Sequence, residues 1–179
     1  MAFRENLAAL KVEFGHAGDA AVSAEVQAAM MQLIEAEERS RPLRVGDTAP
    51  AFQLRDGNNA LVSSDELLGR GPLVVTFYRG LWCPYCQKDL QSFGEVLTAL
   101  QTANASVAAI SHQLWSDTSR QFQQDNPIEF PVLEDETGEV AVSFGIRWAQ
   151  DDLDFIGEQL GIPSAFRVSE PWIVPMQAR

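Results

Sequence analysis

The chain has 179 residues, of which 46% are hydrophobic, so it is long enough to form one domain with a well-buried core. Its formal net charge of −12 argues against nucleic acid and anionic membrane surfaces as partners, because a protein that binds phosphates must supply positive charge. No apolar run approaches the roughly 20 residues of a membrane span, and the first residues lack the apolar core of a signal peptide. We therefore expect a cytoplasmic protein, in a compartment where neighbouring cysteines are more often catalytic than structural.

Residues 1–44 are predicted to form an N-terminal helical arm, followed by a domain at 45–179. Apolar residues recur at helical spacing, and Gly15–Asp19 interrupts the pattern, so two helices are expected. The apolar positions are Leu7, Leu10, Phe14, Val22, Val26, Met30, Leu33 and Ile34. Such an arm would pack on the domain or on a second copy of the chain, so a homodimer is one expectation.

Residues 45–72 have the composition of a β-hairpin followed by a short helix. A turn and a short strand lead to Asp56–Asn59, which is typical of a hairpin turn. A returning strand is predicted at 60–62, and Ser63 or Ser64 could cap the helix.

The segment from Leu73 to Cys86 carries both cysteines of the chain. Leu73–Tyr78 is an apolar, β-branched run, which predicts a strand buried on both faces of a parallel or mixed sheet. Cys83 and Cys86 follow three residues apart, and Pro84 suits the first turn of a helix. The amino end of a helix carries partial positive charge and unpaired N–H groups, both of which stabilise a thiolate. A strand that leads into Cys-x-x-Cys and a helix therefore indicates a redox site.

The rest of the chain alternates helical and extended segments. The helix after Cys83 has an apolar face formed by Leu90, Phe93, Leu97 and Leu100. Further predicted elements are a buried strand at Val107–Ile110, a helix at Asp117–Gln124, a strand at Phe130–Leu133, a turn at Glu134–Gly138, and a short helix or an extended run at 140–146. This alternation predicts an α/β sandwich.

From Val45 to about Trp148 the chain resembles peroxiredoxins of the alkyl hydroperoxide reductase and thiol-specific antioxidant (AhpC/TSA) family. The resemblance is carried by VGDTAPAFQL, VVTFYRGLWCPYC, AAISHQ and FPVLEDETGEVAVSFGI, and the segment FYRGLWCPYC is similar to one subgroup of peroxiredoxin-like proteins. It implies a thioredoxin-like fold, a mixed sheet flanked by helices, with no metal and no organic cofactor. Related sequences continue beyond a segment like PWIVPMQAR, so the resemblance also implies that the family's C-terminal strands and final helix are lacking.

The resemblance leaves the roles of the two cysteines open. On the peroxiredoxin motif Pro-x-x-x-Thr-x-x-Cys, Cys86 attacks the peroxide, Cys83 occupies the threonine position and resolves the sulfenic acid, and Arg79 occupies the proline position. On the Trp-Cys-x-x-Cys motif of thioredoxin, Cys83 attacks and Cys86 resolves. We expect the first arrangement and keep the second as the alternative.

Several neighbours of the cysteines are candidates for supporting roles. Arg79 could stabilise a thiolate and polarise a peroxide oxygen, or form a surface ion pair. Trp82, Pro84 and Tyr85 are expected to line the substrate pocket or dock a reductant, with plain packing as the alternative. By resemblance, Arg179 could supply the strand-borne arginine that peroxiredoxins use.

Other polar residues are expected to stand apart from the chemistry. His112 follows a predicted strand and is expected to be solvated, and the acidic run Glu134–Glu136 is expected to form a solvated turn. His16 and His112 are widely separated and lack ligand spacing with the cysteines, so no metal site is expected.

The resulting hypothesis is a thiol-dependent peroxidase that reduces hydrogen peroxide or alkyl hydroperoxides and is recycled by a thioredoxin-like donor. Two alternatives remain, a thiol–disulfide oxidoreductase acting on protein disulfides and a redox sensor that oxidises without turnover.

Overall fold

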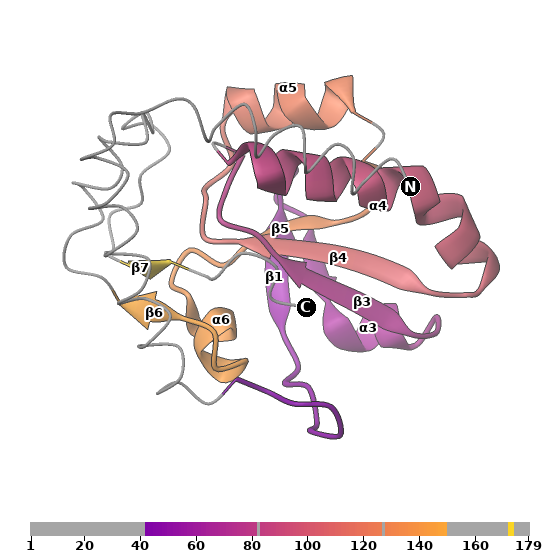
Figure 1. Cartoon of the computed structure of the whole chain (residues 1–179), viewed down its shortest axis with the longest axis vertical. Coiled ribbons are helices and arrows are strands. Elements are labelled where there is room, and N and C mark those ends of the chain that lie inside the picture. The colour runs from indigo at the N-terminus through magenta and orange to yellow at the C-terminus, as the bar shows by residue number, and fades with distance from the viewer. Residues whose placement is uncertain (1–41, 82, 127, 150–171, 174–179) are drawn as a thin grey trace, which may run out of the picture.

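The structure is a computed structural model that describes residues 42–81, 83–126, 128–149 and 172–173 (Figure 1). Its elements are β1 Gln53–Asp56, β2 Leu61–Ser63, α3 Ser64–Leu68, β3 Leu73–Phe77, α4 Pro84–Thr102, β4 Ser106–Ser111, α5 Asp117–Asp125, β5 Val132–Glu134, α6 Glu139–Ser143, β6 Trp148–Ala149 and β7 Trp172–Ile173. The helices predicted within residues 1–41 lie outside the described residues and stay a prediction.

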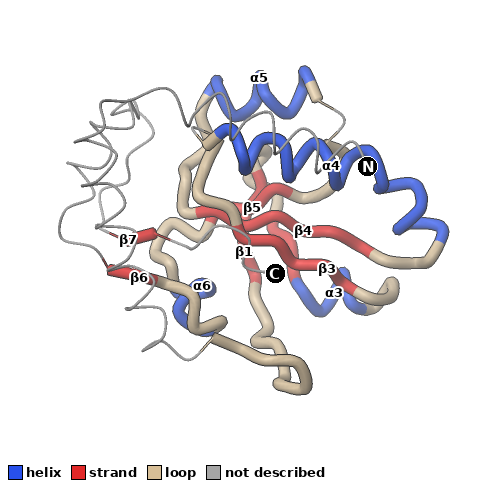
Figure 2. Tube along the Cα trace, viewed as in Figure 1, coloured by secondary structure: helices blue, strands red, loops and turns tan. Residues whose placement is uncertain are grey.

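The first five strands form one mixed sheet in the order β2-β1-β5-β4-β3, while β6 pairs antiparallel with β7 (Figure 2). β3, β4 and β5 run parallel, with Phe77 opposite Ile110 and Ser111 opposite Glu134. β1 pairs antiparallel with both β5 and β2. The three parallel strands therefore end at one edge of the sheet, here called the carboxyl edge, and the residues that follow them are brought together there.

The hairpin and the short helix confirm the sequence prediction. The turn at Asp56–Asn59 is closed by a hydrogen bond from the Asn59 N–H to the Asp56 carbonyl (2.9 Å). Ser63 is the cap residue of α3, and its hydroxyl accepts a hydrogen bond from the Asp65 N–H (3.2 Å). The segment 140–146, predicted as either a short helix or an extended run, begins within the helix α6, which ends at Ser143.

Two predicted strands differ from those observed. β3 is only half-buried at Leu73–Val75, because it lies at the edge of the five-stranded sheet and not in its interior. The strand predicted at Phe130–Leu133 begins at Val132 instead. Phe130 is buried against α4 before the strand starts, and the Pro131 carbonyl accepts a hydrogen bond from the Ala109 N–H (2.9 Å).

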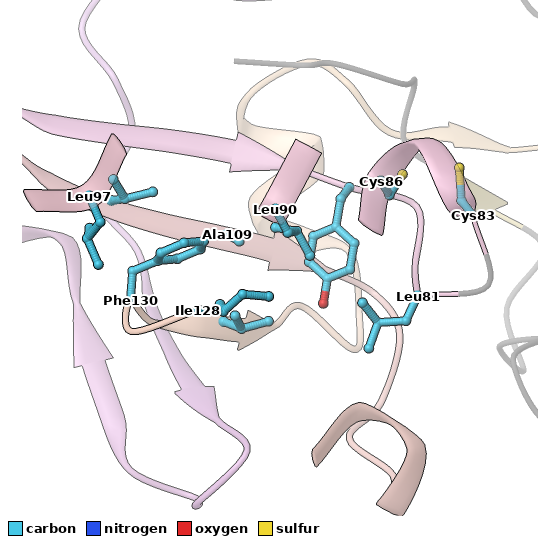
Figure 3. Packing of buried hydrophobic residues seen from close by; sticks show 11 residues of the cluster. Leu81, Cys83, Cys86, Leu90, Leu97, Ala109, Ile128 and Phe130 are labelled. Atoms are coloured by element: carbon cyan, nitrogen blue, oxygen red, sulfur yellow. The ribbon is translucent and has the colours of Figure 1, made fainter. Parts of the chain in front are cut away.

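Helices cover both faces of the sheet and enclose two separate apolar clusters. α4 and α5 lie on one face, and α3 and α6 lie on the other (Figure 1). Beneath α4 and α5 is the cysteine cluster, formed by Tyr78, Leu81, Cys83, Cys86, Leu90, Leu97, Val107, Ala109, Ile128, Phe130 and Val132 (Figure 3). Beneath α3 and α6 is the opposite cluster, formed by Phe52, Leu67, Phe77, Ala108, Ile110, Leu133, Ala141 and Ile146. The alternation of side chains along β3, β4 and β5 divides them between the two clusters.

Candidate active site

Both cysteines lie at the amino end of α4, as the sequence predicts. Cys83 is the cap residue, with an extended backbone (φ −92°, ψ 111°), and Pro84 follows at the first helical position. Cys86 lies in the first turn, and Figure 3 shows both sulfurs at this end of the helix. Both side chains are buried and both are free thiols. The site is thus a dithiol held inside the cysteine cluster.

The surroundings of the two sulfurs shift the pKa values of the two thiols in opposite directions. A hydrogen bond from the Cys86 thiol lowers the pKa of Cys83 to about 6, against the effect of burial, and the Cys86 and Tyr85 N–H groups and the Arg79 charge lower it further. The pKa of Cys86 is raised, first by that hydrogen bond, then by burial and by the charge of Cys83. One negative charge is therefore held on Cys83, and Cys86 stays protonated as its donor.

Arg79 lies in the interior just after β3 and not in a surface ion pair. Its side chain is only 9% exposed, and its charge lowers the pKa of both Cys83 and Cys86. Among the described residues, its Nε atom has no hydrogen-bond partner. A buried guanidinium beside a thiolate can also polarise an oxygen atom brought to the sulfur.

His112 follows β4 at the carboxyl edge and is buried, so the expectation of a solvated histidine is wrong. Its side chain is 5% exposed, and burial followed by the Arg79 charge lowers its pKa to about 4. The imidazole is therefore neutral at pH 7. β4 is flanked by β3 and β5, which explains why the residue after it is enclosed.

The acidic run Glu134–Glu136 at the end of β5 is also less solvated than expected. Asp135 is 2% exposed, and its carboxylate accepts hydrogen bonds from the N–H groups of Ala141 (2.9 Å) and Val140 (3.3 Å) at the start of α6. Glu134 is half-buried and accepts a hydrogen bond from the Trp115 N–H. Burial raises the pKa of both carboxyl groups. Glu136 alone in this run is exposed.

Two glutamines hold the loop before Cys83, which the sequence did not reveal. The Leu81 N–H donates to Gln113 Oε1 (2.5 Å), and the Leu81 carbonyl accepts from Gln87 Nε2 (2.5 Å). Gln113 follows β4 and Gln87 lies on α4, so the N–H and the carbonyl of Leu81 are bound by side chains from two separate elements. The 32-residue separation between Leu81 and Gln113 left no local signal for this contact.

The sequence model of the AhpC/TSA family matches residues 45–174 of this chain. The chain belongs to the AhpC/TSA family. It is 30% identical over 105 residues to a Mycobacterium tuberculosis protein named "Putative peroxiredoxin MT1643", a match that covers 59% of this chain and 68% of that one. The crystal structure of peroxidoxin BcpB from Mycobacterium tuberculosis superposes with a TM-score of 0.56 at 28% identity, over 61% of this chain and 70% of that one. The thioredoxin-like fold implied by the resemblance is thereby confirmed.

This AhpC/TSA chain is also similar to a protein of another activity class. The thiol-disulfide oxidoreductase ResA of Bacillus thuringiensis subsp. konkukian is 21% identical over 108 residues, covering 60% of this chain and 61% of ResA. At that identity the likeness concerns the fold, and it leaves both activity classes open for the AhpC/TSA dithiol.

The remaining site candidates are only partly placed. Pro84 and Tyr85 are half-buried, and Tyr85 packs against the cysteine cluster. Trp82 and Arg179 lie outside the described residues, so their roles stay predictions.

Two further features can be stated for the part of the AhpC/TSA chain that the structure describes. No group of three or more His, Cys, Asp or Glu is placed there to hold a metal ion. None of its helices is long and apolar enough to cross a membrane.

Proposed function

We propose that the protein is a thiol-dependent peroxidase that reduces hydrogen peroxide or alkyl hydroperoxides in the cytoplasm. The observation that carries this proposal is the unequal dithiol: in a chain of the AhpC/TSA family, a buried thiolate at Cys83 faces a protonated Cys86 beside the Arg79 guanidinium. A peroxidase needs one sulfur that is ionised at neutral pH and one thiol that then condenses with the sulfenic acid.

The proposed cycle has three steps. The Cys83 thiolate attacks the terminal oxygen of the hydroperoxide, the O–O bond breaks, and the departing alkoxide or hydroxide takes a proton from solvent. The Cys86 sulfur then displaces water from the Cys83 sulfenic acid and forms a disulfide. A thioredoxin-like dithiol protein returns two electrons and two protons by thiol–disulfide exchange. Sulfur supplies all the electrons, so the cycle requires neither a metal nor an organic cofactor.

The choice of Cys83 as attacking sulfur departs from the arrangement that the sequence favoured. The peroxiredoxin motif points to Cys86, but the N–H groups at the start of α4 and the Cys86 thiol both favour a negative charge on Cys83. The raised pKa of Cys86 suits a resolving thiol, which reacts only after Cys83 has been oxidised.

A coupled assay with thioredoxin, thioredoxin reductase and NADPH tests the proposal. Wild-type protein should sustain NADPH oxidation when hydrogen peroxide or an alkyl hydroperoxide is added, and the Cys83→Ser variant should not. A single oxidation that thioredoxin never reverses would instead support a redox sensor. Wild-type protein that ignores both peroxides while its dithiol stays reactive would contradict the peroxidase proposal.

Thiol–disulfide exchange with protein disulfides is the second candidate. It is favoured by the same lowered pKa of Cys83, since the attacking thiol of an exchange reaction must also ionise near neutral pH. Reduction of insulin disulfides, followed by turbidity, should outpace peroxide consumption if this candidate is correct.

A further inference from the structure

We propose that Gln113 and Gln87 are positioning residues that hold Leu81 and thereby keep the Cys83 sulfur where its thiolate is stabilised. The inference deepens the proposed function and rests on it only in taking Cys83 as the reactive sulfur. The side-chain hydrogen bonds of both glutamines go to Leu81 and not to a sulfur, so both residues would act through the loop.

The loop between β3 and α4 contains a tight turn in which Leu81 is enclosed. The Cys83 N–H donates to the Gly80 carbonyl (3.2 Å), which places Leu81 within the turn. Gly80 has φ 146°, a backbone conformation that favours glycine. Leu81 is buried, so its N–H and carbonyl need partners inside the protein, and the two glutamine amides supply one each.

The two glutamines are themselves anchored to opposite sides of the site. The backbone N–H of Gln113 donates to the Ser111 hydroxyl (3.1 Å) at the end of β4, which holds the Gln113 backbone to the sheet. The Gln87 N–H donates to the Cys83 carbonyl (3.1 Å), so this residue holds both Leu81 and Cys83 against α4. The loop is thus tied to the sheet and to the helix at the same residue, two positions before the reactive sulfur.

The position of Leu81 matters because the loop leads directly to Cys83, and a small cavity lies beside it. Leu81, Gln113, Tyr78 and Leu90 line it, together with residues of α5. Removing either amide leaves one buried polar group of Leu81 without its partner, which favours a shift of the loop. Because the pKa of Cys83 depends on contacts with the Cys86 thiol and with N–H groups at the start of α4, a displaced sulfur loses them.

The test is the pKa of Cys83, measured from the pH dependence of alkylation by iodoacetamide. Gln113→Met and Gln87→Met remove one hydrogen bond each with little change in volume. We expect each to raise the pKa by about one unit, so that alkylation at pH 5 slows about tenfold while alkylation at pH 9 stays within about twofold. Both amides hold one residue, so the double variant should shift the pKa by less than the sum of the single shifts.

Gln91→Met is the matched control. Gln91 lies on the same helix, and its Nε2 donates to Asn126 Oδ1 (2.7 Å) rather than to Leu81. It should leave the pKa of Cys83 unchanged. Shifts of equal size in all three variants, or no shift in Gln113→Met and Gln87→Met, would overturn the proposal. If only one of the two glutamine variants shifted the pKa of Cys83, the claim that both glutamines position Leu81 would be overturned.

Hydrogen exchange of the wild-type protein gives a second test that requires no variant. The Leu81 amide should be protected although it belongs to no helix or strand, and exchange at the rate of an unprotected peptide amide would contradict the proposal. Alkylation reports on the thiolate whatever the substrate is. A wild-type protein that ignores peroxide, with glutamine variants that shift the pKa as expected, would remove the peroxidase function and leave the positioning role intact.

Discussion

The two apolar clusters are built from the same three parallel strands but differ in what else they contain. The cysteine cluster includes two thiols and the Tyr78 phenol, whereas the opposite cluster is formed by aliphatic and aromatic side chains, with Phe77 and Phe144 in ring contact (centroids 5.1 Å apart). Alternation along a strand therefore separates a reactive face from a purely packed face, one residue apart. Changes on the first face should alter both stability and thiol chemistry, and changes on the second should alter stability alone.

The largest expected effect comes from removing the thiolate itself. Because the pKa of Cys83 is lowered to about 6, its alkylation rate should rise with pH through 6 and level off above about 7, as the nucleophilic thiolate becomes the dominant form. Cys83→Ser should slow alkylation at pH 7 by about tenfold or more, because burial still opposes ionisation of Cys86 after the hydrogen bond and the charge of Cys83 are gone. Alkylation quenched at successive times, followed by peptide mapping, measures both rates. A Cys83→Ser variant that reacts as fast as wild type would place the thiolate on Cys86.

A matched pair of core truncations sharpens the contrast between the two clusters. Leu90 and Leu133 are each 1% exposed, Leu90 in the cysteine cluster and Leu133 in the opposite cluster. Leu90→Ala and Leu133→Ala should each lower the free energy of unfolding by about 2–5 kcal/mol, which urea denaturation measures. Leu90 lies one helical turn beyond Cys86, so only Leu90→Ala should also shift the pKa of Cys83. Equal shifts from both variants would show that the two faces are not independent.

The smallest effect is expected at the carboxyl edge, where the two faces meet. The pKa of His112 is lowered from 6.5 to about 4, so between these values the unfolded chain binds a proton that the folded chain does not. The free energy of unfolding should therefore fall as pH decreases through this window, with a slope of up to about 1.4 kcal/mol per pH unit from this group.

His112→Gln removes that contribution and is compared with wild type by urea denaturation at pH 7 and pH 5. The buried carboxyl groups of Glu134 and Asp135 act in the opposite direction, because their pKa values are raised, but they are present in both proteins. The variant should lose less stability on acidification than wild type. An equal loss in both would mean that His112 is not buried in its neutral form.

Local features of the fold were predictable because their causes lie close together in the chain. The turn at Asp56–Asn59, the Ser63 cap and the start of α4 at Pro84 follow from residues within a few positions of each other. The Cys-x-x-Cys site was found for the same reason. The edge position of β3 depends on strand order, which its own residues do not encode.

The surroundings of the site were less predictable because they are formed by distant segments. His112 and Asp135 follow different strands, and their burial comes from neighbours across the carboxyl edge. A polar residue after a strand is usually solvated, so local pattern gave the wrong expectation for both. The hydrogen bond between Leu81 and Gln113 is invisible to the sequence for the same reason.

The most direct test of the central claim is the intact mass of the reduced protein before and after one equivalent of hydrogen peroxide. It should be measured for wild type, Cys83→Ser and Cys86→Ser. We predict that wild type rapidly loses two hydrogens, that Cys86→Ser gains one oxygen on Cys83, and that Cys83→Ser stays unchanged. An oxygen trapped on Cys86 in the Cys83→Ser variant, with Cys86→Ser inert, would contradict the assignment of Cys83 as the attacking sulfur. No reaction of wild type within minutes would contradict the peroxidase function itself.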